Sequence, residues 1–368
     1  GSLNCWGRDN YGQLGDGGTN SDKNTPVSVS LGTTTNPRTA VAVSAGEFHT
    51  CAILDDGSLN CWGFDNYGQL GDGGTDTDKD TPVSVSLGTG RTAVAVSAGA
   101  YHTCAILDDG SLMCWGYDWY GQLGDGGTNT DKDTPVSVSL GTTTNPRTAV
   151  AVSTGGVNTC AILDDGSLNC WGSDGFGQLG NGGTNTEQDT PVSVSLGTGR
   201  TAVAVSVGYA HICAILDDGS LNCWGMDGFG QLGDGGTNTN KNTPVSVSLG
   251  TTTNPRTAVA VSAGRYHTCA ILDDGSLNCW GRDVYGQLGD GGTNTNKDTP
   301  VSVSLGTGRT AVAVSAGGYH TCAILDDGSL KCWGWDTYGQ VGDGGTLLSK
   351  NTPVSVSLGT TTNPRTVA

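Results

Sequence analysis

The stretch AVAVSAGEFHTCAILDDGSLNCWGFDNYGQLGDGG, residues 40–74, decides the fold, because the chain repeats it with few changes along its length. Its central tripeptide Cys-Trp-Gly starts at residues 5, 61, 114, 170, 223, 279 and 332, which gives seven units spaced alternately by 56 and 53 residues. The alternation comes from two kinds of connector, a long GTTTNPR and a short GTGR. A period of this length is typical of solenoids and propellers, in which each repeat is one structural unit.

Each unit contains four runs that read as β-strands, separated by turn residues. In the unit quoted above they are 40–44, 49–54, 58–62 and 82–87. The last run alternates Val and Ser, as a half-exposed outer strand does, while the first is small and apolar on both faces, as a crowded inner strand would be. The pattern predicts an all-β fold, a seven-bladed β-propeller of four-stranded antiparallel blades that forms a single domain over residues 1–368. A solenoid is the alternative that spacing leaves open.

The repeated pattern, AVSAG followed by HTCAILDDGSL, CWG and GQLGDG, resembles the regulator of chromosome condensation repeat. That family forms seven-bladed propellers, so the resemblance implies this fold for essentially the whole chain. Its members include a nucleotide-exchange factor for a small GTPase and a bacterial inhibitor of β-lactamase, so the resemblance implies no single activity. The cysteine pair in each repeat resembles secreted bacterial members of the family.

One repeat unit is incomplete. There are seven Cys-Trp-Gly runs but only six copies of the paired AVAVS and HTC runs, so the unit around Cys5 lacks its two inner strands. We therefore expect one blade to be incomplete in this chain. Either a longer natural chain or another molecule would supply the missing strands, and the longer chain is the favoured explanation.

The composition excludes several classes of function. Lys and Arg total 17 against 35 Asp and Glu, a net charge of −18. An acidic surface repels phosphate, so nucleic acid is excluded as the main partner. The 62 glycines disfavour long helices, and no apolar run is long enough to span a membrane.

Twelve of the thirteen cysteines form pairs ten residues apart. The intervening Asp-Asp-Gly fits a three-residue hairpin loop, which places the two cysteines of a pair opposite each other and within disulfide reach. We predict six disulfides and an unpaired Cys5; the pairs are Cys51–Cys61, Cys104–Cys114, Cys160–Cys170, Cys213–Cys223, Cys269–Cys279 and Cys322–Cys332. Six disulfides imply an oxidising compartment, so the protein is predicted to be secreted, extracellular or at a cell surface. The alternatives are that the cysteines are reduced and buried or, less favoured, that they bind zinc.

The repeats differ mainly in two loops, and these differences predict a binding surface. One loop follows the first strand of each unit and the other follows the third, and since these strands run the same way, both loops emerge on one face. The predicted contacts with a protein or peptide are Arg8, Phe48, Phe64, Tyr101, Tyr117, Trp119, Met226, Arg265, Tyr266, Arg282 and Trp335. Aromatic residues, Arg and Met are enriched at recognition hot spots, whereas drift at tolerant loop tips is the competing explanation.

Three further repeated features are candidates for chemistry. Five histidines share one equivalent site with Asn158, and we expect each to bond a backbone group rather than form a metal-binding or titrating ring; they are His49, His102, His211, His267 and His320. The Asp of WGxDxYG, present in all seven units, is expected to cap its turn. Asp76, Asp78 and Asp80 are the candidate ligands for Ca²⁺, with Asx-turns as the competing explanation.

The sequence contains no nucleophile elbow, phosphate loop or acid–base pair, so we predict no enzyme, no cofactor and no metal. The predicted function is a non-enzymatic extracellular binding platform that recognises a protein or peptide through the variable loops. The alternative is a structural subunit of an extracellular filament or surface layer, which assembles by subunit contacts or by strand donation into the incomplete blade.

Overall fold

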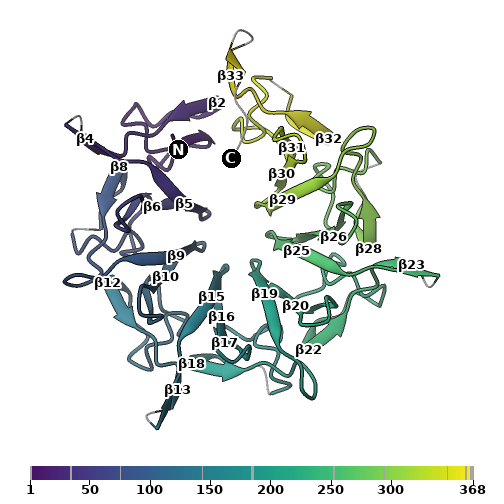
Figure 1. The fold of residues 1–368 in the computed structure, drawn as a ribbon, viewed down its shortest axis with the longest axis horizontal. Helices are drawn as coiled ribbons and strands as arrows, with labels where there is room; N and C mark the ends of the chain where they lie inside the picture. The colour runs from purple at the N-terminus through teal and green to yellow at the C-terminus, as the bar shows by residue number, and fades with distance from the viewer. Residues whose placement is uncertain are drawn as a thin grey trace.

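The chain folds into a ring of antiparallel β-sheets (Figure 1). The computed structural model describes residues 2–33, 35–74, 76–142, 144–183, 186–251, 253–292, 295–345, 347–360 and 363–364. Within this part of the chain, six sheets have four strands each, and their strands follow one another in chain order from the centre of the ring outward. The predicted all-β propeller with four-stranded blades is confirmed, but the described chain forms six such blades and not seven.

The strands of the six blades have the following bounds. Blade 1 contains β5 (Ala40–Ala45), β6 (His49–Leu54), β7 (Leu59–Gly63) and β8 (Lys79–Ser84), and blade 2 contains β9 (Ala93–Ala98), β10 (His102–Leu107), β11 (Leu112–Gly116) and β12 (Lys132–Ser137). Blade 3 contains β15 (Ala149–Thr154), β16 (Asn158–Leu163), β17 (Leu168–Gly172) and β18 (Gln188–Ser193), and blade 4 contains β19 (Ala202–Val207), β20 (His211–Leu216), β21 (Leu221–Gly225) and β22 (Lys241–Ser246). Blade 5 contains β25 (Ala258–Ala263), β26 (His267–Leu272), β27 (Leu277–Gly281) and β28 (Lys297–Ser302), and blade 6 contains β29 (Ala311–Ala316), β30 (His320–Leu325), β31 (Leu330–Trp335) and β32 (Ser349–Ser355).

The seventh Cys-Trp-Gly unit forms only a two-stranded sheet, β1 (Asn4–Gly7) with β2 (Lys23–Ser28). These strands correspond to the third and fourth strands of a complete blade, because Cys5 lies opposite Val27 just as Cys61 lies opposite Val83. The long connectors form four short hairpins: β3 (Gly32–Thr33) with β4 (Asn36–Pro37), β13 (Gly141–Thr142) with β14 (Asn145–Pro146), β23 (Gly250–Thr251) with β24 (Asn254–Pro255), and β33 (Gly359–Thr360) with β34 (Asn363–Pro364).

The register within each blade follows from the turn between its second and third strands. Gly57 closes the Asp-Asp-Gly turn with a φ of 79°, in the left-handed region that favours glycine. Across this turn Cys51 lies opposite Cys61, with Cα atoms 4.1 Å apart. All six predicted disulfides are confirmed, and Cys5 is the one free cysteine.

The hydrophobic core lies between neighbouring blades. Trp115 of blade 2 is fully buried in a cluster that contains Ile53, Leu59 and Leu70 of blade 1. Its indole N–H donates to the backbone carbonyl of Gln69 in blade 1, at 3.0 Å. Since buried aromatic side chains contribute a large apolar area, this packing stabilises the contact between neighbouring blades.

The two-stranded sheet packs against blade 6 and so continues the ring. The indole N–H of Trp6 donates to the Gln340 carbonyl at 3.1 Å, and the Gly344 N–H donates to the Asn24 carbonyl at 3.0 Å. Nearer the centre, no described strand lies between β29 of blade 6 and β5 of blade 1 (Figure 1). We call the space bounded by β29, β5 and β1 the open sector; beside it Val43 is 52% exposed.

Candidate functional site

Both variable loops of each blade lie together on one face of the ring, as predicted. In blade 1 the N–H of Phe64, which follows the third strand, donates to the carbonyl of Phe48, which precedes the second strand, at 2.9 Å. The equivalent bonds are Tyr117 to Tyr101, Ser173 to Val157, Met226 to Ala210, Arg282 to Tyr266 and Trp335 to Tyr319. We call the surface formed by these paired loops the variable face.

One part of the variable face is a continuous cluster of aromatic rings, which we call the aromatic arc. Its members are Tyr11, Phe48, Phe64, Tyr67, Tyr101, Tyr117 and Tyr120. Phe48 stacks on Tyr101 of the next blade, with ring centroids 5.5 Å apart. Tyr11, in the loop between β1 and β2, contacts Phe64 with ring centroids 4.9 Å apart. These half-buried rings therefore support one another across blade boundaries.

The second part combines aromatic rings with guanidinium groups, and we call it the arginine arc. Its members are Arg8, Tyr209, Phe229, Arg265, Tyr266, Arg282, Tyr285, Tyr319, Trp335 and Tyr338. The Cζ atom of Arg282 lies 4.9 Å from the ring centroid of Phe229 and 5.3 Å from that of Tyr266. Arg8 lies over Tyr338 at 5.1 Å. Cation–π contacts hold the guanidinium groups without using their N–H donors.

Arg8 and Arg282 differ from the repeated cations of the ring, because no carboxylate lies within ion-pair distance of either in the described residues. The connector arginines each pair with the Asp-Asp turn of the blade that they lead into: Arg38, Arg91, Arg147, Arg200, Arg256 and Arg309. The lysines at the start of the outer strands each pair with an Asp of their own unit: Lys23, Lys79, Lys132, Lys241, Lys297 and Lys350. On a chain with a net charge of −18, the variable face therefore holds unmatched positive charge.

Arg265 and Glu47 form an ion pair across the mouth of the central channel, although they come from blades 5 and 1. Arg265 also lies over the ring of Tyr209, with its Cζ 4.5 Å from the centroid. Burial raises the pKa of the Glu47 carboxyl, and the charge of Arg265 opposes this shift. Arg265 therefore pairs with a carboxylate at ion-pair distance, whereas the charge of Arg8 acts on Glu47 only from beyond that distance.

The structure divides the predicted contacts into three groups. The aromatic arc contains Phe48, Phe64, Tyr101 and Tyr117, and the arginine arc contains Arg8, Arg265, Tyr266, Arg282 and Trp335. Trp119 is 70% exposed and lies outside both arcs, and Met226 is half-buried.

The constant aromatic residue of each unit was not among the predicted contacts, yet six of the seven lie against variable rings; the seventh, Phe176, is 41% exposed. Tyr67 contacts both Tyr101 and Tyr117, and Tyr285 stacks on Trp335 with an interplanar angle of 26°. Tyr or Phe occurs at this position in every unit, so a comparison of the differences between units does not select it. The signal available in the sequence was the Tyr or Phe that directly precedes Gly-Gln in every unit.

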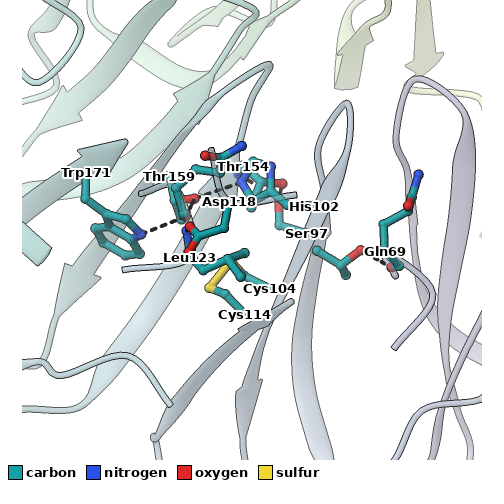
Figure 2. The surroundings of a disulfide bond; sticks show 12 residues. Gln69, Ser97, His102, Cys104, Cys114, Asp118, Leu123, Thr154, Thr159 and Trp171 are labelled. Carbon is teal, nitrogen blue, oxygen red and sulfur yellow. Dashed lines mark hydrogen bonds between the residues drawn. A yellow bond between two sulfur atoms is a disulfide. The ribbon is translucent and has the colours of Figure 1, made fainter. Parts of the chain in front are cut away.

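The histidines join neighbouring blades, and the expectation that they bond backbone groups is wrong. His102 Nε2 lies 2.9 Å from Thr159 Oγ1 of the next blade, and Thr159 in turn donates to the Gln122 carbonyl at 2.8 Å (Figure 2). Because Thr159 uses its proton on Gln122, the Nε2–H of His102 is the donor in this bond. Burial lowers the pKa of His102 to about 3. The same pair, which we call the His–Thr clasp, recurs as His49–Thr103, His211–Thr268 and His267–Thr321.

Both halves of the clasp are replaced together at one interface. Blade 3 has Asn158 in place of His, and blade 4 has Ile212 in place of Thr. Ile212 is fully buried, and the Asn158 side-chain amide donates to the Ser173 carbonyl in its own blade. Since a His at this position would face no hydroxyl, the two replacements form a matched pair.

The Asp of WGxDxYG caps a turn, as predicted. Asp65 Oδ1 accepts the N–H of Leu70 at 3.0 Å, and Asp65 is 1% exposed. Burial raises the pKa of Asp65 to about 7. The equivalent carboxylates accept the same bond in the other six units: Asp9, Asp118, Asp174, Asp227, Asp283 and Asp336.

Of the three acidic residues predicted as candidate ligands for Ca²⁺, Asp78 has a structural use. Asp78 Oδ1 accepts the N–H of Asp65 at 3.1 Å, and Asn240 and Asn296 accept the equivalent N–H in blades 4 and 5. An uncharged Asn therefore serves as well as Asp, which favours an Asx-type cap. Across the residues that the structure describes, no three His, Cys, Asp or Glu side chains are grouped to hold a metal ion, and this includes Asp76 and Asp80.

Comparison with known proteins gives the same architecture. The RCC1-like domain matches residues 87–367, and the regulator of chromosome condensation (RCC1) repeat matches residues 1–53 and 56–106. The chain belongs to the RCC1 repeat family. This RCC1-repeat chain is 31% identical to the ultraviolet-B receptor UVR8 of Arabidopsis thaliana, over 94% of this chain and 75% of the receptor. It is 28% identical to the E3 ubiquitin-protein ligase HERC2 of Homo sapiens over 94% of this chain, which spans only 7% of the ligase.

Solved structures with the same fold include yeast RCC1 (Prp20) bound to Kap60, with a TM-score of 0.82 and 20% identity over 96% of this chain and 83% of that one. Human WBSCR16 also has a TM-score of 0.82 and 20% identity, over 97% of this chain and 94% of its own. At this level of identity the likeness shows the RCC1 fold alone. The likeness of the cysteine pairs to secreted bacterial members stays a prediction. No helix long and apolar enough to cross a membrane occurs in the described RCC1-repeat ring.

Proposed function

We propose that this RCC1-repeat chain is a non-enzymatic binding platform that recognises a protein or peptide through the variable face. The observation that carries the proposal is the arginine arc, where Arg8 and Arg282 lie over aromatic rings and have no carboxylate partner in the described chain. The repeated cations elsewhere in the ring are matched by carboxylates, so the unmatched pair is not a requirement of the fold. Arg and aromatic residues dominate the energetics of protein recognition.

The relatives support a binding role without naming a partner for this chain. Yeast RCC1 is seen bound to Kap60, and UVR8 is a receptor. We propose that the partner of this chain carries carboxylates next to an apolar or aromatic group. A carboxylate matches the two parallel N–H donors of a guanidinium, and the rings of Tyr266, Tyr319 and Trp335 offer apolar contact beside it.

The absence of enzymatic activity is part of the proposal. Among the described residues, Glu47 is the one carboxylate at the mouth of the channel, and its carboxyl is held in an ion pair with Arg265. Four of the five histidines, His49, His102, His211 and His267, are buried in clasps between blades. General acid–base chemistry needs a titratable pair within reach of a substrate, which this arrangement does not offer.

Export to an oxidising compartment is also proposed, and the six disulfides support it. Thiol titration of the denatured protein, isolated from its natural source under acid quench, tests this directly. An exported chain is expected to show at most the one thiol of Cys5. A titre near thirteen thiols would place the protein in a reducing compartment instead.

Selection of peptides from a displayed random library on the folded chain tests the binding proposal. The wild-type chain is expected to enrich peptides that contain both acidic and aromatic residues. Replacing Arg8 and Arg282 together by Ala should lower the affinity for these peptides about tenfold or more, because two desolvated charge-assisted contacts are lost. Arg147→Ala, which removes a cation from the opposite face, is the matched control and should leave the affinity unchanged. Enriched peptides that bind the double variant as tightly as the wild type would contradict the proposal.

A second candidate function is a structural subunit of an extracellular filament or surface layer. The observation that favours it is the exposure of large apolar side chains in loops, with Trp119 at 70%, Leu347 at 64% and Leu348 at 70%. Exposed apolar groups of this size favour contacts between molecules. Sedimentation and electron microscopy over a range of concentrations test it. Filaments that lengthen with concentration support the structural role, and a monomer at all concentrations rejects it.

A further inference from the structure

The innermost strand of each complete blade contains a β-bulge near its start. In blade 2, Ala93 and Ala95 lie opposite consecutive residues of β10, so Val94 between them has no partner on that strand. The bulge recurs at the same place in the other five blades, at Val41, Val150, Val203, Val259 and Val312. A β-bulge bends its strand locally and re-aims the side chain of the extra residue.

The six bulge valines are exposed apolar side chains near the centre of the ring. Val94 is 60% exposed, whereas the adjacent Ala93 is 4% exposed, and the other five bulge valines are between 60% and 65% exposed. Because the inner strands surround the centre of the ring (Figure 1), these side chains form a band of apolar surface there, which we call the valine collar. Four of its members have a complete blade on each side: Val94, Val150, Val203 and Val259. Exposed apolar surface of this extent is typical of interaction sites.

The valine collar lies among the Asp-Asp-Gly turns, on the face of the ring opposite the variable face. The Ala93 N–H donates to the Gly57 carbonyl in the turn of blade 1, at 2.9 Å. The Asp108 N–H in the turn of blade 2 donates to the Thr92 carbonyl at 3.0 Å. The start of β9, which carries Val94, therefore lies between two such turns. The same two backbone bonds hold the starts of β15, β19, β25 and β29.

The turns around the valine collar carry a surplus of negative charge. In blade 2 the single guanidinium of Arg91 pairs with both Asp108 and Asp109, and the turn of each other complete blade is arranged in the same way. Twelve carboxylates therefore stand against six guanidinium groups, a surplus of six negative charges. Hydrogen bonds from the hydroxyl and N–H of Ser58 lower the pKa of Asp56, so this carboxyl is charged at neutral pH.

We propose that the valine collar binds a protein segment in which lysine or arginine side chains flank an apolar side chain. The apolar side chain packs on the valines, and the cations lie against the surplus carboxylates of the turns. Burial of apolar surface stabilises this contact, while the complementary charges set its orientation and speed association. The same carboxylates repel nucleic acid, anionic lipid and the matching surface of a second copy. Because the valine collar and the variable face lie on opposite faces, this proposal and the proposed function fail independently.

A fluorescently labelled peptide of four Lys-Leu-Gly repeats is the probe, and fluorescence anisotropy with the folded chain is the measurement. We expect saturable binding that weakens as the salt concentration rises, because the charges involved are exposed to solvent. A peptide with Ser in place of Leu keeps the charge and should bind about tenfold or more weakly, since it lacks the apolar contact. A peptide with Glu in place of Lys keeps the apolar side chains and should not bind.

Two variants of the chain separate the apolar contact from the charge. The first replaces the four valines that have complete blades on both sides by Ser, and it should bind the Lys-Leu-Gly peptide about tenfold more weakly with an unchanged circular dichroism spectrum, because these side chains are exposed. The second replaces the first Asp of four turns by Asn, which leaves each Arg its other Asp and makes each turn neutral; it should remove most of the salt dependence. The positions changed in this second variant are Asp108, Asp164, Asp217 and Asp273. Trp119→Ser, which removes an exposed apolar side chain elsewhere, is the matched control and should bind like the wild type.

Equal affinity for the Leu and Ser peptides would overturn the proposal, because the acidic turns alone would then explain the binding. Unchanged affinity in the folded valine variant would also overturn it, as would the absence of binding by the Lys-Leu-Gly peptide. Sedimentation of the chain without peptide covers the remaining occupant. If the wild type associates with itself and the valine variant does not, a second copy occupies the valine collar and the proposal is overturned.

Discussion

Replacing Asn158 by His and Ile212 by Thr would restore the His–Thr clasp at the one interface between complete blades that lacks it. Four interfaces carry the clasp, and in each the threonine also donates to a glutamine carbonyl of the preceding blade. The corresponding carbonyl between blades 3 and 4 belongs to Gln178, which already accepts the Trp224 indole N–H at 2.8 Å. The acceptor that the new threonine needs is therefore in place.

The single changes should each destabilise the fold. Asn158→His alone places the imidazole donor against Ile212, which is fully buried, and a buried unsatisfied donor costs ~1–3 kcal/mol. Ile212→Thr alone removes buried apolar surface worth about 1–2 kcal/mol. In the double variant the donor regains its acceptor, so we expect a favourable coupling free energy of ~1–3 kcal/mol.

Guanidinium titrations of the four proteins, with disulfides intact, give the coupling free energy from a double-mutant cycle. Far-UV circular dichroism and tryptophan fluorescence should report the same transition, which checks that one free energy describes unfolding. Additivity within about 0.5 kcal/mol would refute the reasoning, since independent sites behave in this way. The Asn158–Ile212 pair would then be a coincidence and not a matched replacement.

Three further perturbations follow from the same contacts. Burial raises the pKa of Asp65 to about 7, above its ordinary value of 3.8, so the folded state holds a proton that the unfolded chain has lost between about pH 4 and 7. The free energy of unfolding of the wild type should therefore fall as the pH rises through this window. Asp65→Asn keeps the acceptor for Leu70 but cannot titrate. In denaturation curves it should reduce the dependence of the free energy of unfolding on pH by at most ~1.4 kcal/mol per pH unit. Replacing Cys160 and Cys170 by Ala should lower the free energy of unfolding by about 3 kcal/mol and leave the circular dichroism spectrum unchanged, because the bridge constrains a short loop. Arg147→Ala should lower the free energy of unfolding by less than ~1 kcal/mol, because its ion pairs are exposed, and this loss should vanish in high salt. A larger loss measured by calorimetry would contradict this expectation.

The fold and the disulfides were predictable because the signals are local. The alternation of Val and Ser in the outer strands and the Asp-Asp-Gly turn set the register of each hairpin within about ten residues of chain. Cys51 and Cys61 therefore meet as expected. The count of Cys-Trp-Gly and HTC runs also predicted the incomplete blade, which the structure shows as the two-stranded sheet.

The His–Thr contacts between blades were not predictable from spacing, because they join residues 54 or 57 positions apart. His49 and Thr103 lie in the same place in successive repeats, and nothing in either repeat alone shows that they touch. The joint departure at Asn158 and Ile212 was the available signal, and comparing the exceptional residues of neighbouring repeats would have found it. The constant rings such as Tyr67 were missed for the opposite reason, because they never vary.

The central claim is that the variable face binds a partner through its unmatched arginines. Hydrogen-exchange mass spectrometry of the chain, with and without a saturating acidic peptide from the library, tests it most directly. We expect slower exchange in the loops around Arg8, Arg282 and Trp335, and no change in the Asp-Asp-Gly turns of the opposite face. Protection confined to those turns, or spread evenly over both faces, would contradict the claim.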